Sequence, residues 1–128
     1  MSAMSDYLEN EILDHILATA SYTAPATVYV GLSTGSFGDD NSGTELSGSG
    51  YGRVAASFGG AASGTASNDA AIEFSAATGS WGTVSHFGLF DASSSGNLLI
   101  HGALTSSKVI ETGDILKVAV GDMDISAD

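Results

Sequence analysis

The 128-residue sequence contains no cysteine, which excludes disulfide bonds, a thiolate nucleophile and thiolate metal ligands. Only 3 residues are lysine or arginine, against 15 aspartates and glutamates, and the formal net charge is −12. A chain this acidic cannot neutralise the phosphates of DNA or RNA, and an anionic membrane surface would repel it. No apolar run approaches the roughly 18–20 residues that span a bilayer. We therefore expect a soluble protein whose partners include neither nucleic acid nor a membrane.

The composition is that of a folded protein. The hydrophobic fraction of 43% and the mean hydropathy of +0.20 are too high for a disordered chain. No basic, apolar leader opens the sequence, so we expect synthesis in the cytoplasm of the producing cell. The length predicts a single domain, residues 1–128, formed by a helix at residues 6–18 and a β domain at residues 27–126.

Clear helical periodicity is confined to residues 6–18. Ser5 or Asp6 can cap the start of this helix, and Pro25 rules out its continuation into the next segment. An apolar stripe with four-residue spacing can pack on the chain's own sheet or dock onto another chain, and the two can coexist. The stripe consists of Leu8, Ile12 and Ile16, with Leu13 and Leu17 beside it.

From Thr27 onward the hydrophobic period changes to two, which is typical of strands with one buried face. We expect residues 84–90 and 98–104 to form one hairpin, and residues 108–111 and 115–120 to form a second. Several short strands separated by glycine-rich turns predict a mainly β fold, an antiparallel β-sandwich or jelly-roll-like domain preceded by one N-terminal α-helix. Further short strands are expected at residues 27–32, 51–58, 72–74 and 123–125.

No arrangement of residues predicts catalysis or a bound cofactor. The three histidines, His15, His86 and His101, lack the paired spacing of zinc ligands. His86 and His101 can face each other across the first hairpin, where we favour packing or solvent exposure over metal binding. Neither a phosphate-binding loop nor a nucleophile elbow is present, so we expect a non-enzymatic protein.

Two groups of acidic residues need separate interpretation. The segment Asp39–Glu45 mixes carboxylates, an amide and hydroxyls, which hard cations favour, but it lacks the spacing of a helix-loop-helix calcium site. We favour a solvated loop, with calcium binding as the alternative. Asp122 and Asp124, with Asp114 in the preceding turn, favour a charged edge that blocks strand aggregation over an acid/base pair.

Trp81 is the only tryptophan and lies between two glycines. Such a side chain can fold back onto the core, stack on a sugar or anchor a subunit interface. If the protein binds sugars, we expect a groove lined by Trp81, Tyr51 or Tyr29.

Short motifs occur in a specific order over nearly the whole chain. They are Met4–Asn10, Leu13–His15, Ala26–Leu32, Gly50–Arg53, Ser67–Asn68, Ser80–Ala92, Gly96–Leu99, Gly102–Thr105 and Gly121–Ile125. Together these motifs resemble a family of small structural proteins of tailed bacteriophages that are commonly labelled phage tail fibre proteins.

The resemblance implies a non-enzymatic virion protein, exposed on the particle surface and made in the host cytoplasm, with no catalytic residues to carry over. A tail-fibre or baseplate component is the first interpretation. Capsid decoration by a cement protein that stabilises the head is the alternative, followed by a free carbohydrate-binding module for a host surface glycan. The implied partners are other capsid, tail or baseplate subunits and further copies of this chain, as a homotrimer. The hypothetical contact residues are Leu8, Ile12, Ile16, Trp81 and Phe87.

Overall fold

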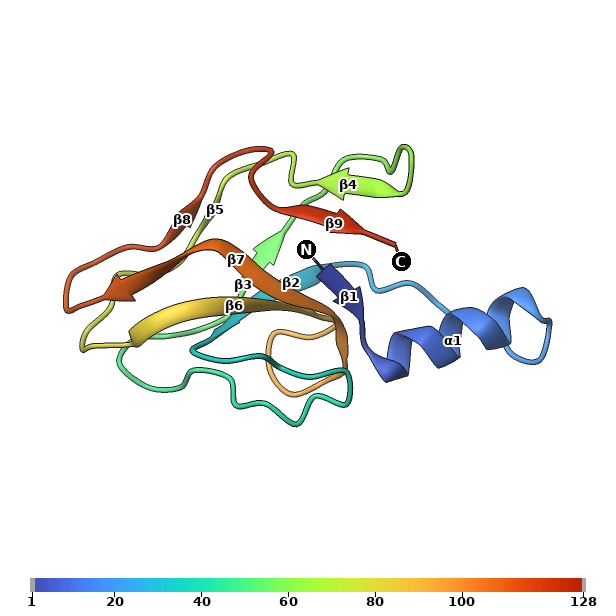
Figure 1. Ribbon diagram of the computed structural model, residues 1–128, viewed down its shortest axis with the longest axis horizontal. Helices are drawn as coiled ribbons and strands as arrows, with labels where there is room; N and C mark the ends of the chain where they lie inside the picture. Colours follow the sequence, from blue (N-terminus) through green and yellow to red (C-terminus); the bar gives the residue numbers. More distant parts are fainter. Residues whose placement is uncertain (1, 128) are drawn as a thin grey trace.

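The computed structural model describes residues 2–127, which form nine antiparallel strands and one helix (Figure 1). This architecture confirms the expected mainly β fold with an N-terminal α-helix. The helix is α1 (Asp6–Ile16), and the strands are β1 (Ser2–Met4), β2 (Val28–Ser33), β3 (Val54–Ala56), β4 (Thr65–Ser67), β5 (Ile72–Glu73), β6 (Gly82–Phe90), β7 (Leu98–Ile110), β8 (Lys117–Val118) and β9 (Asp124–Ser126).

The strands form two layers with the main core between them. Five strands make one sheet in the order β1-β7-β6-β2-β3, and two ribbons, β4–β9 and β5–β8, lie over it (Figure 1). Apolar side chains of the sheet meet those of the ribbons and their connections, as expected for a sandwich-like arrangement. The buried core comprises Val30, Leu32, Ile72, Phe74, Ala77, Trp81, Val84, Phe87, Leu89, Ile110, Leu116 and Met123.

The opposite face of the sheet carries a smaller apolar cluster. Phe90 packs there with Phe37 and Leu98, and the rings of Phe37 and Phe90 meet edge to face at 5.6 Å. Phe37 belongs to the long loop that follows β2, so this loop covers part of the second face. Both faces of β6 are therefore buried near its C-terminal end, which explains why residues 87–90 carry no polar side chain.

The predicted second hairpin is wrong. Strand β7 runs on to Ile110 and pairs with β6 as far as the pair Gly82↔Ile110. Residues 117–118 pair with β5 instead, through the pair Ile72↔Val118. In the sequence, Thr105 and its serine neighbours resemble a turn. However, the N-terminal part of β6 pairs with residues 108–110, and this pairing keeps β7 extended.

A large, irregular bulge interrupts the β6–β7 ladder. His86 pairs with Ala103, and the next pair is Val84↔Lys108. Residues 104–107 of β7 therefore face the single residue Ser85 of β6. A bulge of this kind bends the strand and redirects its side chains, and bulges are common next to functional sites.

Helix α1 begins at a cap that also attaches it to the sheet. The Ser5 hydroxyl accepts a hydrogen bond from the Leu8 amide at 3.2 Å and donates one to the Leu98 carbonyl oxygen. The Ser5 amide donates to the Leu99 carbonyl oxygen at 2.8 Å. The helix ends at Ile16, two residues before the predicted boundary, and projects away from the β layers (Figure 1).

Strand β1, which the sequence did not predict, places the N-terminal residues at the edge of the sheet. It pairs with β7 from Ser2↔Gly102 to Met4↔Ile100. The Ser126 amide of β9 donates to the Ser2 hydroxyl at 2.9 Å, so the two ends of the described chain lie side by side.

Candidate functional site

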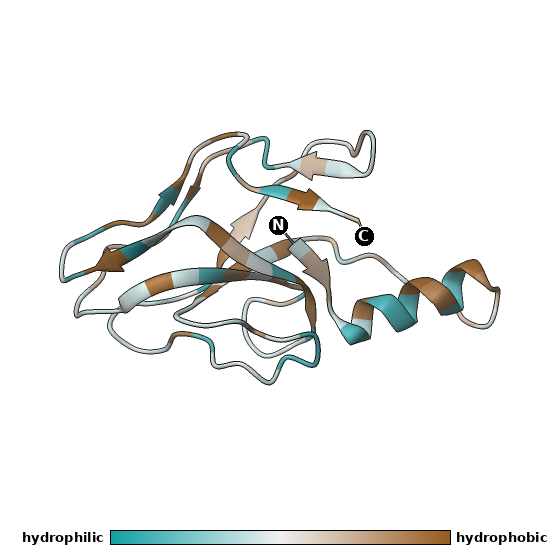
Figure 2. Cartoon of the chain, in the orientation of Figure 1, coloured by the Kyte–Doolittle hydropathy of each residue, from teal (hydrophilic) through white to brown (hydrophobic). Residues whose placement is uncertain are grey.

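The predicted apolar stripe of α1 is divided between the fold and solvent. Leu8 is buried, Ile12 is half-buried, and the far end of the helix is exposed (Figure 2). We call the exposed end the apolar tip, and it consists of Leu13 (55% exposed), Ile16 (70%) and Leu17 (67%). Three adjacent large aliphatic side chains in water form a surface that a partner chain would stabilise by covering it.

Helix α1 contacts β7 and β1, and its start lies beside β1 in Figure 1. Among residues 2–127, no helix is both long enough and apolar enough to cross a membrane.

Trp81 and Phe87, the other two predicted contact residues, lie in the chain's own core. Trp81 is 6% exposed and Phe87 is 4% exposed. The Trp81 Nε1–H donates to the Ser49 carbonyl oxygen at 2.9 Å, so the polar edge of the indole is satisfied inside the protein. This position is the one expected if Trp81 folds back onto the core. The contact surface proposed below therefore rests on α1.

The expected sugar groove of aromatic side chains is not formed around Trp81. The ring of Tyr51 meets Trp81 edge to face at 5.6 Å and stacks on Phe74 at 6.4 Å. Tyr29 lies in β2 and is half-buried. Tyr51 and Trp81 pack together inside the fold, so their faces are not available for stacking on a sugar.

A polar cluster centred on Arg53 fastens the long loop to the sheet. The Arg53 guanidinium makes a two-pronged ion pair with Glu45, with Nη2 2.7 Å from Oε1 and Nε 2.9 Å from Oε2. Its Nη1 donates to the carbonyl oxygens of Ala92 and Ser95, each at 2.8 Å. The guanidinium carbon also lies 3.6 Å from the centroid of the Phe90 ring. One side chain thus joins two loops and the sheet.

Tyr51 completes this cluster from the other side of Glu45. Its hydroxyl donates to Glu45 Oε2 at 2.5 Å and accepts a hydrogen bond from the Leu32 amide at 2.9 Å. Burial, together with the adjacent Glu45 carboxylate, raises the pKa of Tyr51 far above its usual range. These groups satisfy one another's hydrogen bonds, so the cluster stabilises the fold and holds no free reactive group.

The acidic residues of Asp39–Glu45 are engaged separately. Asp39 Oδ1 lies 2.7 Å from His101 Nε2, and Glu45 pairs with Arg53. Hydrogen bonds from Ser42 hold the pKa of Asp40 below its usual value. Over the described part of the chain, no three His, Asp or Glu side chains gather in a geometry that could hold a metal ion.

His86 and His101 do not sit directly opposite each other. His101 pairs with Gly88 and His86 pairs with Ala103, so the two histidines are diagonal neighbours on the hairpin. His86 Nδ1 lies 2.7 Å from the Ser85 hydroxyl, whereas His101 is close to Asp39. Each ring has its own partner.

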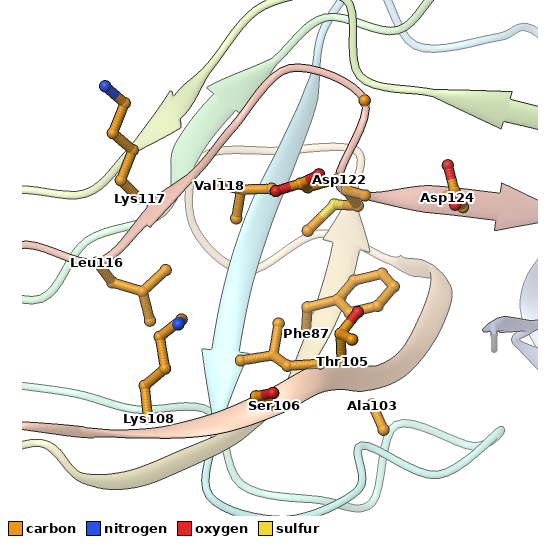
Figure 3. Close-up of a pocket in the computed structure, with 13 residues that line it drawn as sticks. Phe87, Ala103, Thr105, Ser106, Lys108, Leu116, Lys117, Val118, Asp122 and Asp124 are labelled. Carbon is orange, nitrogen blue, oxygen red and sulfur yellow. The ribbon is translucent and has the colours of Figure 1, made fainter.

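A half-open hollow of about 470 Å³ lies between β7 and the chain segment that runs from β8 to β9 (Figure 3). Buried side chains of Phe87, Leu116 and Met123 form its floor. Lys108, Lys117, Asp122 and Asp124 stand around it, and all four are exposed. The sequence favoured a charged edge for Asp122 and Asp124, and no pattern in it placed either lysine beside this hollow.

Comparison with known proteins gives one family. Residues 3–126 match the family model described as Podophage GP4 fiber I protein gp80. No curated protein matches the chain. The family match confirms the resemblance to phage tail fibre-type proteins. Because it spans nearly the whole sequence, the protein belongs to this family of phage fibre structural proteins and is associated with virions.

Proposed function

We propose that this chain is a non-enzymatic, surface-exposed fibre or baseplate subunit of a tailed phage, attached to neighbouring virion subunits through α1. The observation that carries the proposal is the match to a phage fibre family over residues 3–126. It is supported by the apolar tip, because a helix that exposes Leu13, Ile16 and Leu17 at the far end gains stability when another chain covers it.

The charge distribution supports a contact of this kind. The net charge of −12 keeps the β domain soluble and would repel another acidic subunit. The three large side chains of the apolar tip carry no charge, and the single carboxylate beside them is that of Asp14. Assembly as a homotrimer belongs to the same proposal and predicts a solution mass three times the 12.8 kDa of the chain.

Ile16→Asp tests the attachment. A carboxylate buried in an apolar contact costs more than about 2 kcal/mol, which corresponds to a more than tenfold loss of affinity. We expect the variant to fold, because Ile16 is 70% exposed, and to be largely missing from purified particles. Quantitative mass spectrometry of particles gives the number of copies incorporated.

Asn10→Asp is the matched control. It adds the same charge to the same helix at another exposed position, and incorporation should remain at the wild-type level. Normal incorporation of Ile16→Asp would refute attachment through the apolar tip, and an equal loss in both variants would assign the effect to charge alone.

A further inference from the structure

The chain contains two lysines, Lys108 and Lys117, and both are exposed and line the same hollow. The chain has three lysines and arginines in total, and the third, Arg53, is largely buried in its pair with Glu45. Lys108 and Lys117 take part in no ion pair with a described carboxylate within 4.0 Å. Among residues 2–127 of a chain with a net charge of −12, the lysine and arginine side chains therefore lie either at this hollow or in the Arg53–Glu45 pair.

The β7 bulge supplies the hydroxyl groups of the hollow. Thr105 and Ser106 lie within residues 104–107, where four residues of β7 face only Ser85 of β6. A regular ladder would alternate these side chains between the two faces of the sheet. The bulge instead brings both to the hollow, and Figure 3 shows Thr105 beside Phe87 on the sheet side.

The opposite wall provides hydrogen-bond acceptors. Figure 3 shows Asp122 and Val118 across the hollow from Phe87, and Lys108 rising from β7 toward Leu116. Lys117 extends outward from β8, on the side away from Leu116, and its cross-strand neighbour in β5 is Glu73. Lys108, Asp122 and the two hydroxyls thus surround an apolar floor.

We propose that this hollow binds an acidic saccharide, an inference that deepens and depends on the proposed fibre function. The anionic group of the sugar pairs with Lys108. Sugar hydroxyls donate to Asp122 and exchange hydrogen bonds with Thr105 and Ser106. The hollow is within the usual size range of small-ligand sites and has room for one or two sugar rings.

The mixed charge selects this ligand class over more strongly charged ones. Asp122 and Asp124 would repel a polyphosphate or an acidic peptide that carries several charges. A saccharide with one anionic group per ring and several hydroxyls satisfies both Lys108 and Asp122.

The test is binding of the purified full chain to immobilised saccharides that carry glucuronate, galacturonate, sialate or phosphate, beside the neutral counterpart of each. We expect binding to at least one acidic member at low salt and at least tenfold weaker binding to its neutral counterpart. About 0.5 M NaCl should weaken the binding strongly, because the contact is charge-assisted. Lys108→Gln should raise Kd by about tenfold or more.

Ala61→Asp is the control, because it changes the net charge by the same −1 at an exposed position that does not line the hollow. Equal losses for Ala61→Asp and Lys108→Gln, equal binding of the neutral saccharides, or binding to none of the acidic ones would each overturn the site. The failure of the fibre assignment is measured separately by locating the protein on particles, since an isolated chain can bind a saccharide wherever it is located.

Discussion

Gly31 of β2 lies against the Arg53 cluster, where there is no space for a side chain. A Cβ atom at this position would lie 2.7 Å from Glu45 Oε2 and 2.9 Å from a ring carbon of Phe90. Gly31→Ala must therefore displace the ion pair or the ring, and we expect a loss of about 1–3 kcal/mol in the free energy of unfolding. Urea denaturation measures the change.

Gly52→Ala provides the comparison for this prediction. Its Cβ would meet nothing within 4 Å, so stability should be unchanged or slightly increased. If Gly31→Ala unfolds at the same urea concentration as wild type, the cluster is looser than the structure describes.

Tyr51 gives the protein a specific alkaline sensitivity. Because the pKa of Tyr51 is raised in the folded state, the unfolded chain releases this proton first as the pH rises above about 10. The folded state then binds more protons than the unfolded state, and the free energy of unfolding falls by up to about 1.4 kcal/mol per pH unit. Urea denaturation of wild type and Tyr51→Phe between about pH 8 and pH 11 should show the steeper fall in wild type. Parallel curves would contradict this assignment.

The positions and partners of single side chains were the hardest features to predict from the sequence. Trp81 between glycines was compatible with a core position, a sugar platform or an interface, because glycine neighbours say nothing about where a side chain points. Glu45 appeared as part of a solvated acidic loop, whereas its partner Arg53 follows eight residues later and approaches only when the loop folds over Phe90.

At the scale of elements, Asn68 connects the ribbon layer. It is 2% exposed, donates to the carbonyl oxygens of Ala70 and Ala119 at 2.9 Å, and accepts from the Met123 amide at 2.9 Å. Asn68→Ala leaves the buried Met123 amide without its acceptor and removes the side-chain donors to Ala70 and Ala119, although the Ala119 carbonyl oxygen still accepts from the Asp122 amide. We expect the substitution to lower the free energy of unfolding by about 2 kcal/mol.

The same substitution at exposed Asn97, whose side chain bonds only Asp91, should cost less than about 1 kcal/mol. Thermal and urea unfolding of the two variants compare these costs directly. Equal effects would show that Asn68 does not hold the β4–β9 ribbon.

Local patterns predicted elements well where the local signal decides the structure. The four-residue apolar spacing and the Ser5 cap identified α1 to within two residues of its end. The alternation at residues 27–32 and 84–90 identified β2 and β6. The prediction of the second hairpin was wrong because β6 is long enough to pair with residues 108–110. The local pattern of β7 carries no information about the length of β6.

At the scale of the whole molecule, the sequence pattern predicted the fold class. Short strands and glycine-rich turns were sufficient for a mainly β, sandwich-like arrangement. The hollow of Lys108 and Lys117 was not predictable, because its two lysines come from β7 and β8, and these strands do not pair with each other. Such a site is created by the packing of layers.

The central claim is the proposed position of the protein on the phage tail, which the family match and the apolar tip support. Immunogold labelling of purified phage particles with an antibody to this protein, viewed by negative-stain microscopy, tests it most directly. The account predicts gold confined to the tail or its tip. Gold over the whole head surface would contradict the fibre assignment and identify a capsid decoration protein instead.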